Sequence, residues 1–222
     1  MARIARQHAV AARRGVTSVR MIGRGQLTRP TTKVEKMEAK PLQVGDHAPN
    51  HALLTLDHQS VHLSETFKQG TTLLTFLRHF GCTFCRQWLS QLENRFTDLT
   101  AAGLEVVAVA MGDPKHAARY CPQLAPSATC LSDSTVEVYN VYGLKRAGLK
   151  EFASLDMLVK GARATIQGYF PGEVTADPTM LPGTFIVDNA GIVRYAYYSK
   201  HPGDHPDIDA LIHAAQAVKI GT

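Results

Sequence analysis

Two cysteines three residues apart carry the clearest chemical signal in the sequence. Cys82 and Cys85 stand in the string Phe-Leu-Arg-His-Phe-Gly-Cys-Thr-Phe-Cys-Arg-Gln-Trp, which spans residues 76–88. In a first helical turn this spacing puts both sulfurs on one side, close enough to form a disulfide. A reduced pair offers one attacking thiolate and one resolving thiol, so a two-electron exchange can finish within one molecule. The pattern predicts a dithiol–disulfide redox site.

The elements around the pair favour a thiolate. Residues 71–77 are nearly all apolar and predict a buried strand, and from Cys82 to about Ala102 the apolar residues recur at helical spacing until Gly103. A helix N-terminus carries about half a positive charge and contributes up to about 2 kcal/mol, which is roughly 1.5 pKa units. Any larger lowering of a thiol pKa requires nearby cations. The candidates are Arg78, His79 and Arg86.

Zinc binding and plain packing are the two alternatives for this pair. Zinc sites use the same spacing but usually add a second pair, and the sequence has no second Cys-x-x-Cys. The histidine pairs at four-residue spacing fall in strand or loop segments, where that spacing does not converge on a metal: His47 with His51 and His58 with His62. An inert pair of packing cysteines would have apolar neighbours, whereas here an Arg-His pair and a glycine adjoin the motif.

The other two cysteines are weaker signals. Cys121 precedes Pro122 near a predicted helix end, and Cys130 lies in a predicted strand at 128–131. We interpret both as small apolar core residues. A resolving role in a second disulfide is the alternative.

Pro182 stands just before a predicted strand at 184–187, where its missing N–H costs no ladder hydrogen bond. A cis Leu181–Pro182 bond that faces the cysteines would suit a redox site. An ordinary trans turn is the alternative, because most X–Pro bonds are trans.

The remaining pattern predicts an α/β domain with a mixed central sheet. Residues 143–182 are expected to be irregular apart from one short helix at 151–159, as in functional loops or mobile covers. The other expected elements are a hairpin at 51–56 and 60–63, a strand at 104–111, helices from Asp113 and from Ser132 to Tyr142, a final hairpin at 184–187 and 192–198, and a helix at 206–218.

Composition limits the class of protein. The chain has 222 residues, 45% of them hydrophobic, and a net charge of +5. Residues 1–40 hold ten of the 24 Lys and Arg but two of the 19 acids, which leaves 14 bases and 17 acids, a net of −3, in residues 41–222. A basic nucleic-acid-binding face is therefore not expected. No apolar run approaches the roughly 18 residues of a membrane span.

This asymmetry divides the chain into a basic tail, residues 1–40, and a domain, residues 41–222. The tail is interpreted as disordered or non-native, with translation from Met37 as one explanation, and organelle targeting by residues 1–36 as the alternative. Without such targeting we expect a cytoplasmic protein.

Four strings resemble the alkyl hydroperoxide reductase/thiol-specific antioxidant group of the thioredoxin-fold superfamily, specifically its peroxiredoxin-like branch with Cys-x-x-Cys. The resemblance covers about residues 41–218. Animal members of this branch include a prostaglandin F synthase-type reductase and redox-regulatory proteins. The four strings are residues 44–49 (Val-Gly-Asp-His-Ala-Pro), 76–86, 131–144 and 182–194.

The departures from a typical peroxiredoxin shape the expected chemistry. Arg78 occupies the position of the usual Pro, Cys82 that of the usual Thr, and Cys85 that of the peroxidatic Cys, while Pro182 stands about where a supporting Arg would be. A fast hydroperoxidase is therefore not implied. Pro182 and Cys-x-x-Cys instead resemble thioredoxin-like thiol–disulfide enzymes. The resemblance to thioredoxins implies that Cys82, at the exposed edge of the helix, is the nucleophile. The resemblance to peroxiredoxins implies that Cys85 is the nucleophile. We slightly favour Cys82.

The resemblance implies an enzyme that cycles between dithiol and disulfide at Cys82 and Cys85. Arg78 and His79 would support the thiolate, and Pro182 would shape the cleft. The acceptor, a peroxide or another oxidised small molecule, would bind under residues 145–181. Thioredoxin or a similar dithiol would supply electrons, with no cofactor. The alternatives are a non-catalytic redox sensor, or binding module, with a regulatory disulfide, and a zinc-binding interaction domain.

Overall fold

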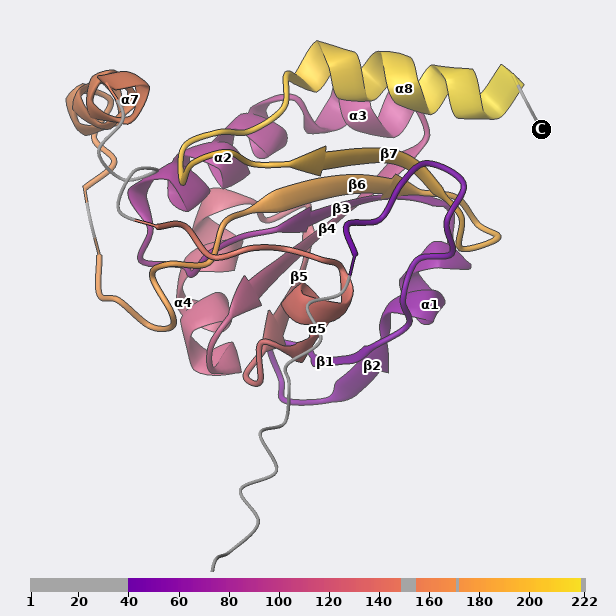
Figure 1. The fold of residues 1–222 in the computed structure, drawn as a ribbon, viewed down its shortest axis with the longest axis horizontal. Helices are drawn as coiled ribbons and strands as arrows, with labels where there is room; N and C mark the ends of the chain where they lie inside the picture. Colours follow the sequence, from indigo (N-terminus) through magenta and orange to yellow (C-terminus); the bar gives the residue numbers. More distant parts are fainter. Residues whose placement is uncertain (1–39, 149–154, 171, 221–222) are drawn as a thin grey trace, which may run out of the picture. The chain divides into compact units, whose positions relative to one another are not determined.

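A mixed sheet forms the centre of the computed structural model, which describes residues 40–148, 155–170 and 172–220 (Figure 1). The strand order is β2-β1-β5-β4-β3-β6-β7. Strands β3, β4 and β5 are parallel, whereas β6 runs antiparallel to β3 and β7 antiparallel to β6. The strands are β1 (Ala52–Leu54), β2 (Ser60–His62), β3 (Thr71–Phe76), β4 (Leu104–Met111), β5 (Thr129–Asp133), β6 (Gly183–Val187) and β7 (Val193–Tyr198).

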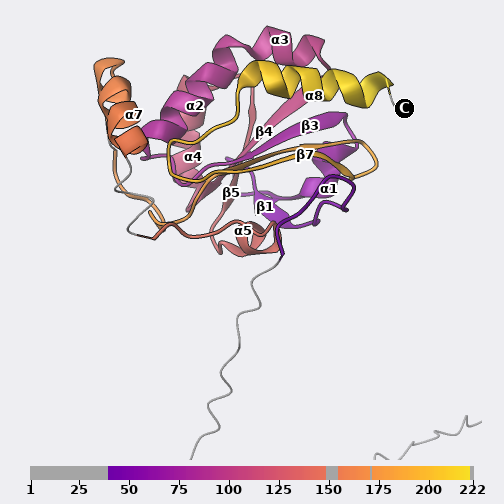
Figure 2. The same ribbon diagram turned by 45° about the horizontal axis from the view of Figure 1, so that its top comes forward.

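Helices cover both faces of the sheet, as the two ribbon views show (Figures 1 and 2). Apolar residues of α2, α3, α4, α7 and α8 pack in one core cluster, and those of α1 and α5 pack in a second cluster on the other face. The helices are α1 (Leu63–Phe67), α2 (Thr83–Asn94), α3 (Phe96–Ala101), α4 (Pro114–Leu124), α5 (Glu137–Val141), α7 (Leu155–Ile166) and α8 (Ile208–Ile220).

The central strands are apolar on both sides because each contributes alternate residues to the two clusters. In β3, Leu73 joins the α2 side and Leu74 the α5 side, and in β4, Val106 and Val107 divide in the same way. All four side chains are buried. This alternation explains why residues 71–77 and 104–111 have no polar stripe, and it confirms both strands as buried central elements.

The predicted α/β class and mixed central sheet are confirmed, and so are both predicted hairpins. Three local predictions are wrong. The helix expected from Ser132 to Tyr142 is shorter, because Ser132 and Asp133 belong to β5 and α5 begins at Glu137. The helix expected from Cys82 to Ala102 is divided at Arg95, whose φ of −112° and ψ of 14° end α2 and begin α3. Residues 60–63 were expected to be strand throughout, but α1 starts at Leu63, with Glu65 accepting a hydrogen bond from the N–H of His62.

The least regular region also differs from expectation. The short helix predicted at 151–159 is found as α7 (Leu155–Ile166), which continues through Gly161. Residues 151–154 lie outside the described part of the chain. Ala164 of α7 is buried against α2, and Gly161 faces the Phe84 ring, so a small-residue face lets the two helices pack closely.

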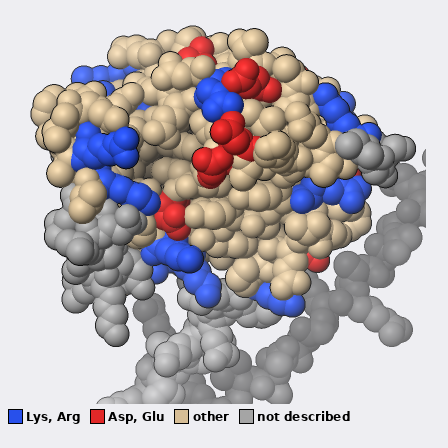
Figure 3. Space-filling model, turned by 90° about the horizontal axis from the view of Figure 1, so that it is seen from above, with Lys and Arg blue, Asp and Glu red and all other residues tan. Residues whose placement is uncertain are grey.

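The face formed by α2, α3, α7 and α8 carries a scatter of basic and acidic side chains on a mostly uncharged surface (Figure 3). A hollow lies at its left, the side that α7 occupies in Figure 1, next to basic side chains. Within the described residues, no helix is long and apolar enough to span a bilayer. The predictions for the tail, residues 1–40, lie outside the described residues except at Lys40.

Candidate active site

The β3–α2 junction places the two cysteines. Cys82 is the N-cap residue of α2 and Cys85 lies in its first turn, so both sulfurs sit at the electropositive end of the helix. The intervening loop is fixed from within, because the N–H of Cys82 donates to the carbonyl of His79 at 3.0 Å. The predicted location at a strand-to-helix junction is confirmed.

Arg78 contacts both sulfurs. Its guanidinium Nη1 donates to Cys82 Sγ at 3.3 Å, and its backbone N–H donates to Cys85 Sγ at the same distance. The guanidinium also donates through Nη2 to the carbonyl of Pro178. Arg78 is only 7% exposed, so its charge acts with little screening by water. The structure therefore brings together three of the residues singled out from the sequence.

The two thiols differ in acidity. A hydrogen bond from Cys85 and the charge of Arg78 together outweigh burial and lower the pKa of Cys82 from 9.0 to about 6. Burial and the hydrogen bond with Cys82 raise the pKa of Cys85 well above 9.0. At neutral pH this arrangement is a Cys82 thiolate that accepts a hydrogen bond from a Cys85 thiol.

His79 and Arg86 are placed differently from Arg78. His79 is 3% exposed, and burial, together with the charge of Arg78, lowers its pKa to about 4, so the imidazole is neutral near pH 7. Its role in the site stays a prediction. Arg86 donates to the carbonyl of Phe170 at 3.1 Å, and its guanidinium lies 5.3 Å from the centre of the Tyr120 ring.

Pro182 precedes β6, whose Gly183 pairs with Phe76 at the end of β3. The Leu181–Pro182 bond is trans, so the trans alternative is the one the structure adopts. Pro182 lines a cavity of about 210 Å³, and the hydrogen bonds described above do not include it. Its predicted role in the site remains untested.

A segment after α7 covers the cysteine loop. The N–H of Gly172 donates to the carbonyl of Gly81 at 2.9 Å, and a Cβ at Gly81 would overlap the carbonyl oxygen of Glu173. We call the described residues of 168–178 the cover. Cys82 is 5% exposed and Cys85 is fully buried, so the expectation that Cys82 lies at an exposed edge is wrong. The physical reason is the cover, which lies over the cysteine loop. Its sequence has neither a helical nor a strand pattern, so its position there could not be predicted.

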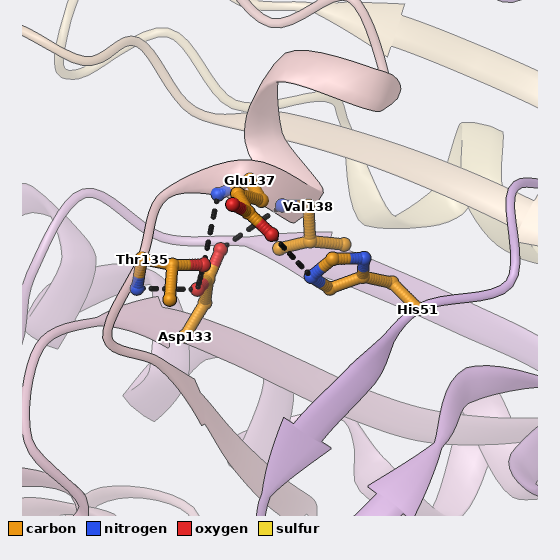
Figure 4. A network of polar contacts seen from close by, with 5 residues as sticks. All are labelled: His51, Asp133, Thr135, Glu137 and Val138. Carbon is orange, nitrogen blue, oxygen red and sulfur yellow. Dashed lines mark hydrogen bonds and ion pairs between the residues drawn. The ribbon is translucent and has the colours of Figure 1, made fainter. Parts of the chain in front are cut away.

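Tyr139 supports the loop from the opposite face and was not identified as a site residue from the sequence. Its hydroxyl lies 2.6 Å from the carbonyl of Leu77, to which it donates, and 3.0 Å from that of Val109, so it joins the ends of β3 and β4. Asp133, at the end of β5, orients α5 by accepting hydrogen bonds from the N–H groups of Thr135 and Val138 (Figure 4). The Tyr139–Gly143 string could have suggested a buried tyrosine near the cysteine loop. The sequence does not show which carbonyl groups its hydroxyl contacts.

Cys121 and Cys130 are joined by a disulfide between α4 and the start of β5. Interpreting them as unpaired core residues is therefore wrong, although both are buried. Their Cα atoms are 6.5 Å apart, within the range that a disulfide spans. A nine-residue spacing in sequence gives no sign that a helix and a strand bring these positions together.

A metal centre finds no support in the described part of the chain. Within it, no three His, Cys, Asp or Glu side chains gather in a group that could hold an ion. Three of the four histidines considered as ligands, His51, His58 and His62, lie around β1 and β2. The fourth, His47, pairs with Ile192 beside β7, at the other end of the sheet order, so it lies apart from them.

Comparison with known proteins gives one family and several distant relatives. The model of the AhpC/TSA family matches residues 44–196. Peroxiredoxin-like 2C of Bos taurus is 21% identical over 72% of this chain and 74% of its own. A prostamide/prostaglandin F synthase of Salmo salar is 23% identical over 81% and 88%. The crystal structure of peroxidoxin BcpB from Mycobacterium tuberculosis superposes with a TM-score of 0.58 at 16% identity, covering 80% of this chain and 98% of that one.

Proposed function

Because the chain belongs to the AhpC/TSA family, we propose that it is a thiol–disulfide oxidoreductase that reduces a hydroperoxide, or another oxidised small molecule, through Cys82 and Cys85. One observation carries the proposal. Arg78 contacts both sulfurs, and the surroundings lower the pKa of Cys82 while raising that of Cys85. Such a division of roles between attacking and resolving thiols is what a dithiol cycle requires.

The cycle starts at Cys82. Its thiolate attacks one oxygen of the peroxide, the O–O bond breaks, and the other oxygen leaves as an alcohol after taking a proton, so that Cys82 becomes a sulfenic acid. Arg78 stabilises the thiolate by donating a hydrogen bond from Nη1 to Cys82 Sγ. The Cys85 thiol then attacks the Cys82 sulfur, its proton leaves with the sulfenic oxygen as water, and the disulfide forms. An external dithiol such as thioredoxin reduces the disulfide through a mixed disulfide.

The order of attack follows from acidity and helix position. Cys82 has the lower pKa and the greater exposure, so it is the better first nucleophile, whereas Cys85 is fully buried and holds its proton. This favours the thioredoxin-type assignment over the peroxiredoxin-type one, in which Cys85 attacks first.

Single-cysteine variants test the cycle. With hydroperoxide and a thioredoxin system, Cys82→Ser should abolish turnover. Cys85→Ser should still consume about one equivalent of peroxide and then stop, with a sulfenic acid detectable by mass at Cys82. The double variant of Cys121 and Cys130 to Ala is the matched control and should keep turnover. Unchanged activity in both Cys82→Ser and Cys85→Ser would contradict the proposal.

A non-catalytic redox sensor is the second candidate, and the cover over Cys82 favours it. A cysteine residue that is only 5% exposed suits a single oxidation event better than rapid exchange with a large reductant protein. Measured turnover separates the two functions. A sensor would consume one equivalent of oxidant for each protein and would not oxidise a thioredoxin system continuously.

A further inference from the structure

A second cavity lies beside α2, and neither Cys82 nor Cys85 lines it. It has a volume of about 300 Å³ and opens between α2, α7 and the loop at 203–206. It corresponds to the size of small ligand pockets. Phe84 forms part of its wall, and Gly203 packs so close to that ring that a Cβ there would lie 2.9 Å from Cδ1.

Half of the residues that line this cavity have polar or basic side chains other than histidine, and the charged ones among them are basic. Two basic side chains and three amides face it from two helices, and among the described residues that line it none is acidic. They recur at helical spacing on each helix, so each set forms one stripe. These residues are Lys160, Arg163 and Gln167 on and just after α7, and Gln87 and Gln91 on α2.

A side-chain hydrogen bond between two glutamines joins the α2 side of the cavity to the α7 side. The amide of Gln87 donates to Gln167 Oε1 at 2.6 Å, which joins α2 to the end of α7. Below it, Gly161 and the buried Ala164 allow the helices to pack closely. The cavity is therefore a built feature of the helix pair rather than a gap between loose side chains.

His205 is the unusual residue of the site. Its ring stacks on Trp88 with the centroids 4.8 Å apart and 4° between the planes. Both ring nitrogens are buried, and neither has a hydrogen-bond partner among the described residues. A buried polar group without a partner costs roughly 1–3 kcal/mol, so a ligand that supplies a partner would recover that cost.

The loop that carries His205 is already ordered. The Asp204 carboxylate accepts from the Tyr197 hydroxyl and from the N–H of Lys200, both at 2.7 Å. These two hydrogen bonds hold the loop in place, and the Asp204 carboxylate keeps its negative charge beside His205. Burial, with the nearby charge of Lys160, lowers the pKa of His205 to about 3, and a neutral ring still offers one N–H donor.

From this geometry we infer that the cavity between α2, α7 and the 203–206 loop binds a small molecule bearing carboxylate or phosphate groups, held by Lys160, Arg163 and His205. Guanidinium and ammonium groups recognise both anions, and the glutamine amides can complete the hydrogen bonding. The site is separate from the redox chemistry, because neither cysteine lines it.

The chain contains its own reporter for this site. Trp88 is the only tryptophan, and it lies against His205 in the cavity wall. We would titrate the reduced full-length protein at pH 7.5 with inorganic phosphate or with citrate, holding ionic strength constant with sodium chloride, and record the emission of Trp88. We expect a saturable change with at least one probe. Saturation with phosphate alone assigns a phosphate ligand, and saturation with citrate alone assigns a carboxylate ligand.

Charge-removing variants locate the binding. Lys160→Gln and Arg163→Gln should each weaken the apparent affinity about tenfold. The matched controls, Lys68→Gln just after α1 and Arg119→Gln on α4, should bind as the unaltered protein does. His205→Phe keeps a stacked ring and removes both nitrogens, and it should also weaken binding while the thermal melting curve shows a folded protein. A signal that does not saturate with either probe, or that is the same in all variants, would overturn the inference.

Discussion

At the scale of single residues, Arg78 decides the chemistry of the site. It contacts Cys82 with its side chain and Cys85 with its backbone, so one residue serves both thiols. A lysine could supply the charge at this position but not the planar fork that reaches a sulfur and a carbonyl together. Arg78→Lys is accordingly not a conservative change here.

The first prediction concerns the pH dependence of Cys82. The thiolate is the reactive form, so the rate of alkylation by iodoacetamide should rise as pH rises through about 6 and level off above it. Arg78→Gln removes the nearby charge and should move this midpoint upward by about one unit or more. Arg119→Gln is the control and should leave it unchanged. Rates are followed by mass, and peptide mapping identifies Cys82 as the alkylated residue. A midpoint near 9 in the unaltered site would contradict the assignment.

At the scale of elements, α5 begins with a strained residue. Val136 has a φ of 67°, in the left-handed region that a β-branched residue rarely adopts. The hydrogen bonds that Asp133 accepts on either side hold the turn, and α5 carries Tyr139 to the end of β3 (Figure 4). The strain is thus tolerated in an element that supports the cysteine loop.

A pair of substitutions measures this strain. Val136→Ala removes the branched side chain but keeps a Cβ, whereas Val136→Gly removes the Cβ as well. We expect the glycine variant to exceed the alanine variant in free energy of unfolding by about 1 kcal/mol, the reverse of their order at ordinary positions. Denaturant unfolding gives the difference directly. An alanine variant as stable as the glycine variant would show that the turn relaxes without strain.

The cover is the second element that controls access to Cys82. Gly81→Ala places a methyl group where the Glu173 carbonyl now lies, so the cover should be displaced. We expect Cys82 to react several-fold faster with a bulky maleimide, with a smaller effect for iodoacetamide. Gly70→Ala, whose Cβ would meet only the Glu105 side chain at 3.4 Å, is the matched control. An unchanged ratio of the two rates would mean that the cover does not limit access.

At the scale of the whole molecule, the Cys121–Cys130 disulfide links a helix to the sheet within one core. Closing a loop of this length should stabilise the fold by about 2–3 kcal/mol, mainly by restricting the unfolded chain. Replacing both cysteines by Ala should lower the free energy of unfolding by that amount and leave the Cys82 chemistry intact. The intact mass of the air-oxidised protein after alkylation checks the bond. Four alkylated thiols would contradict it.

How far the sequence predicts this molecule depends on the range of the interactions involved. Periodicity identifies β3 and β4 because each is buried on both faces, and the helix start at Cys82 follows from its spacing to the apolar stripe. The Arg78 contact was anticipated because it is local, four residues from Cys82.

Long-range contacts escaped prediction. The cover reaches Gly81 from a segment with no regular hydrogen-bond pattern, about ninety residues away along the chain. The Cys121–Cys130 bond depends on how α4 packs beside β5, and the His205–Trp88 stack depends on a loop after β7. Such contacts are set by tertiary packing and leave no period in the sequence.

The shared guanidinium of Arg78 has a practical consequence for chemical labelling. An electrophile that reaches the Cys82 sulfur also meets the Arg78 guanidinium, whose Nη1 donates to that sulfur and whose Nη2 donates to the Pro178 carbonyl. A warhead that carries its own acceptor, such as an amide oxygen set to replace that carbonyl, would engage the same fork. Selective covalent reagents for this protein should therefore be designed around the arginine as much as around the sulfur.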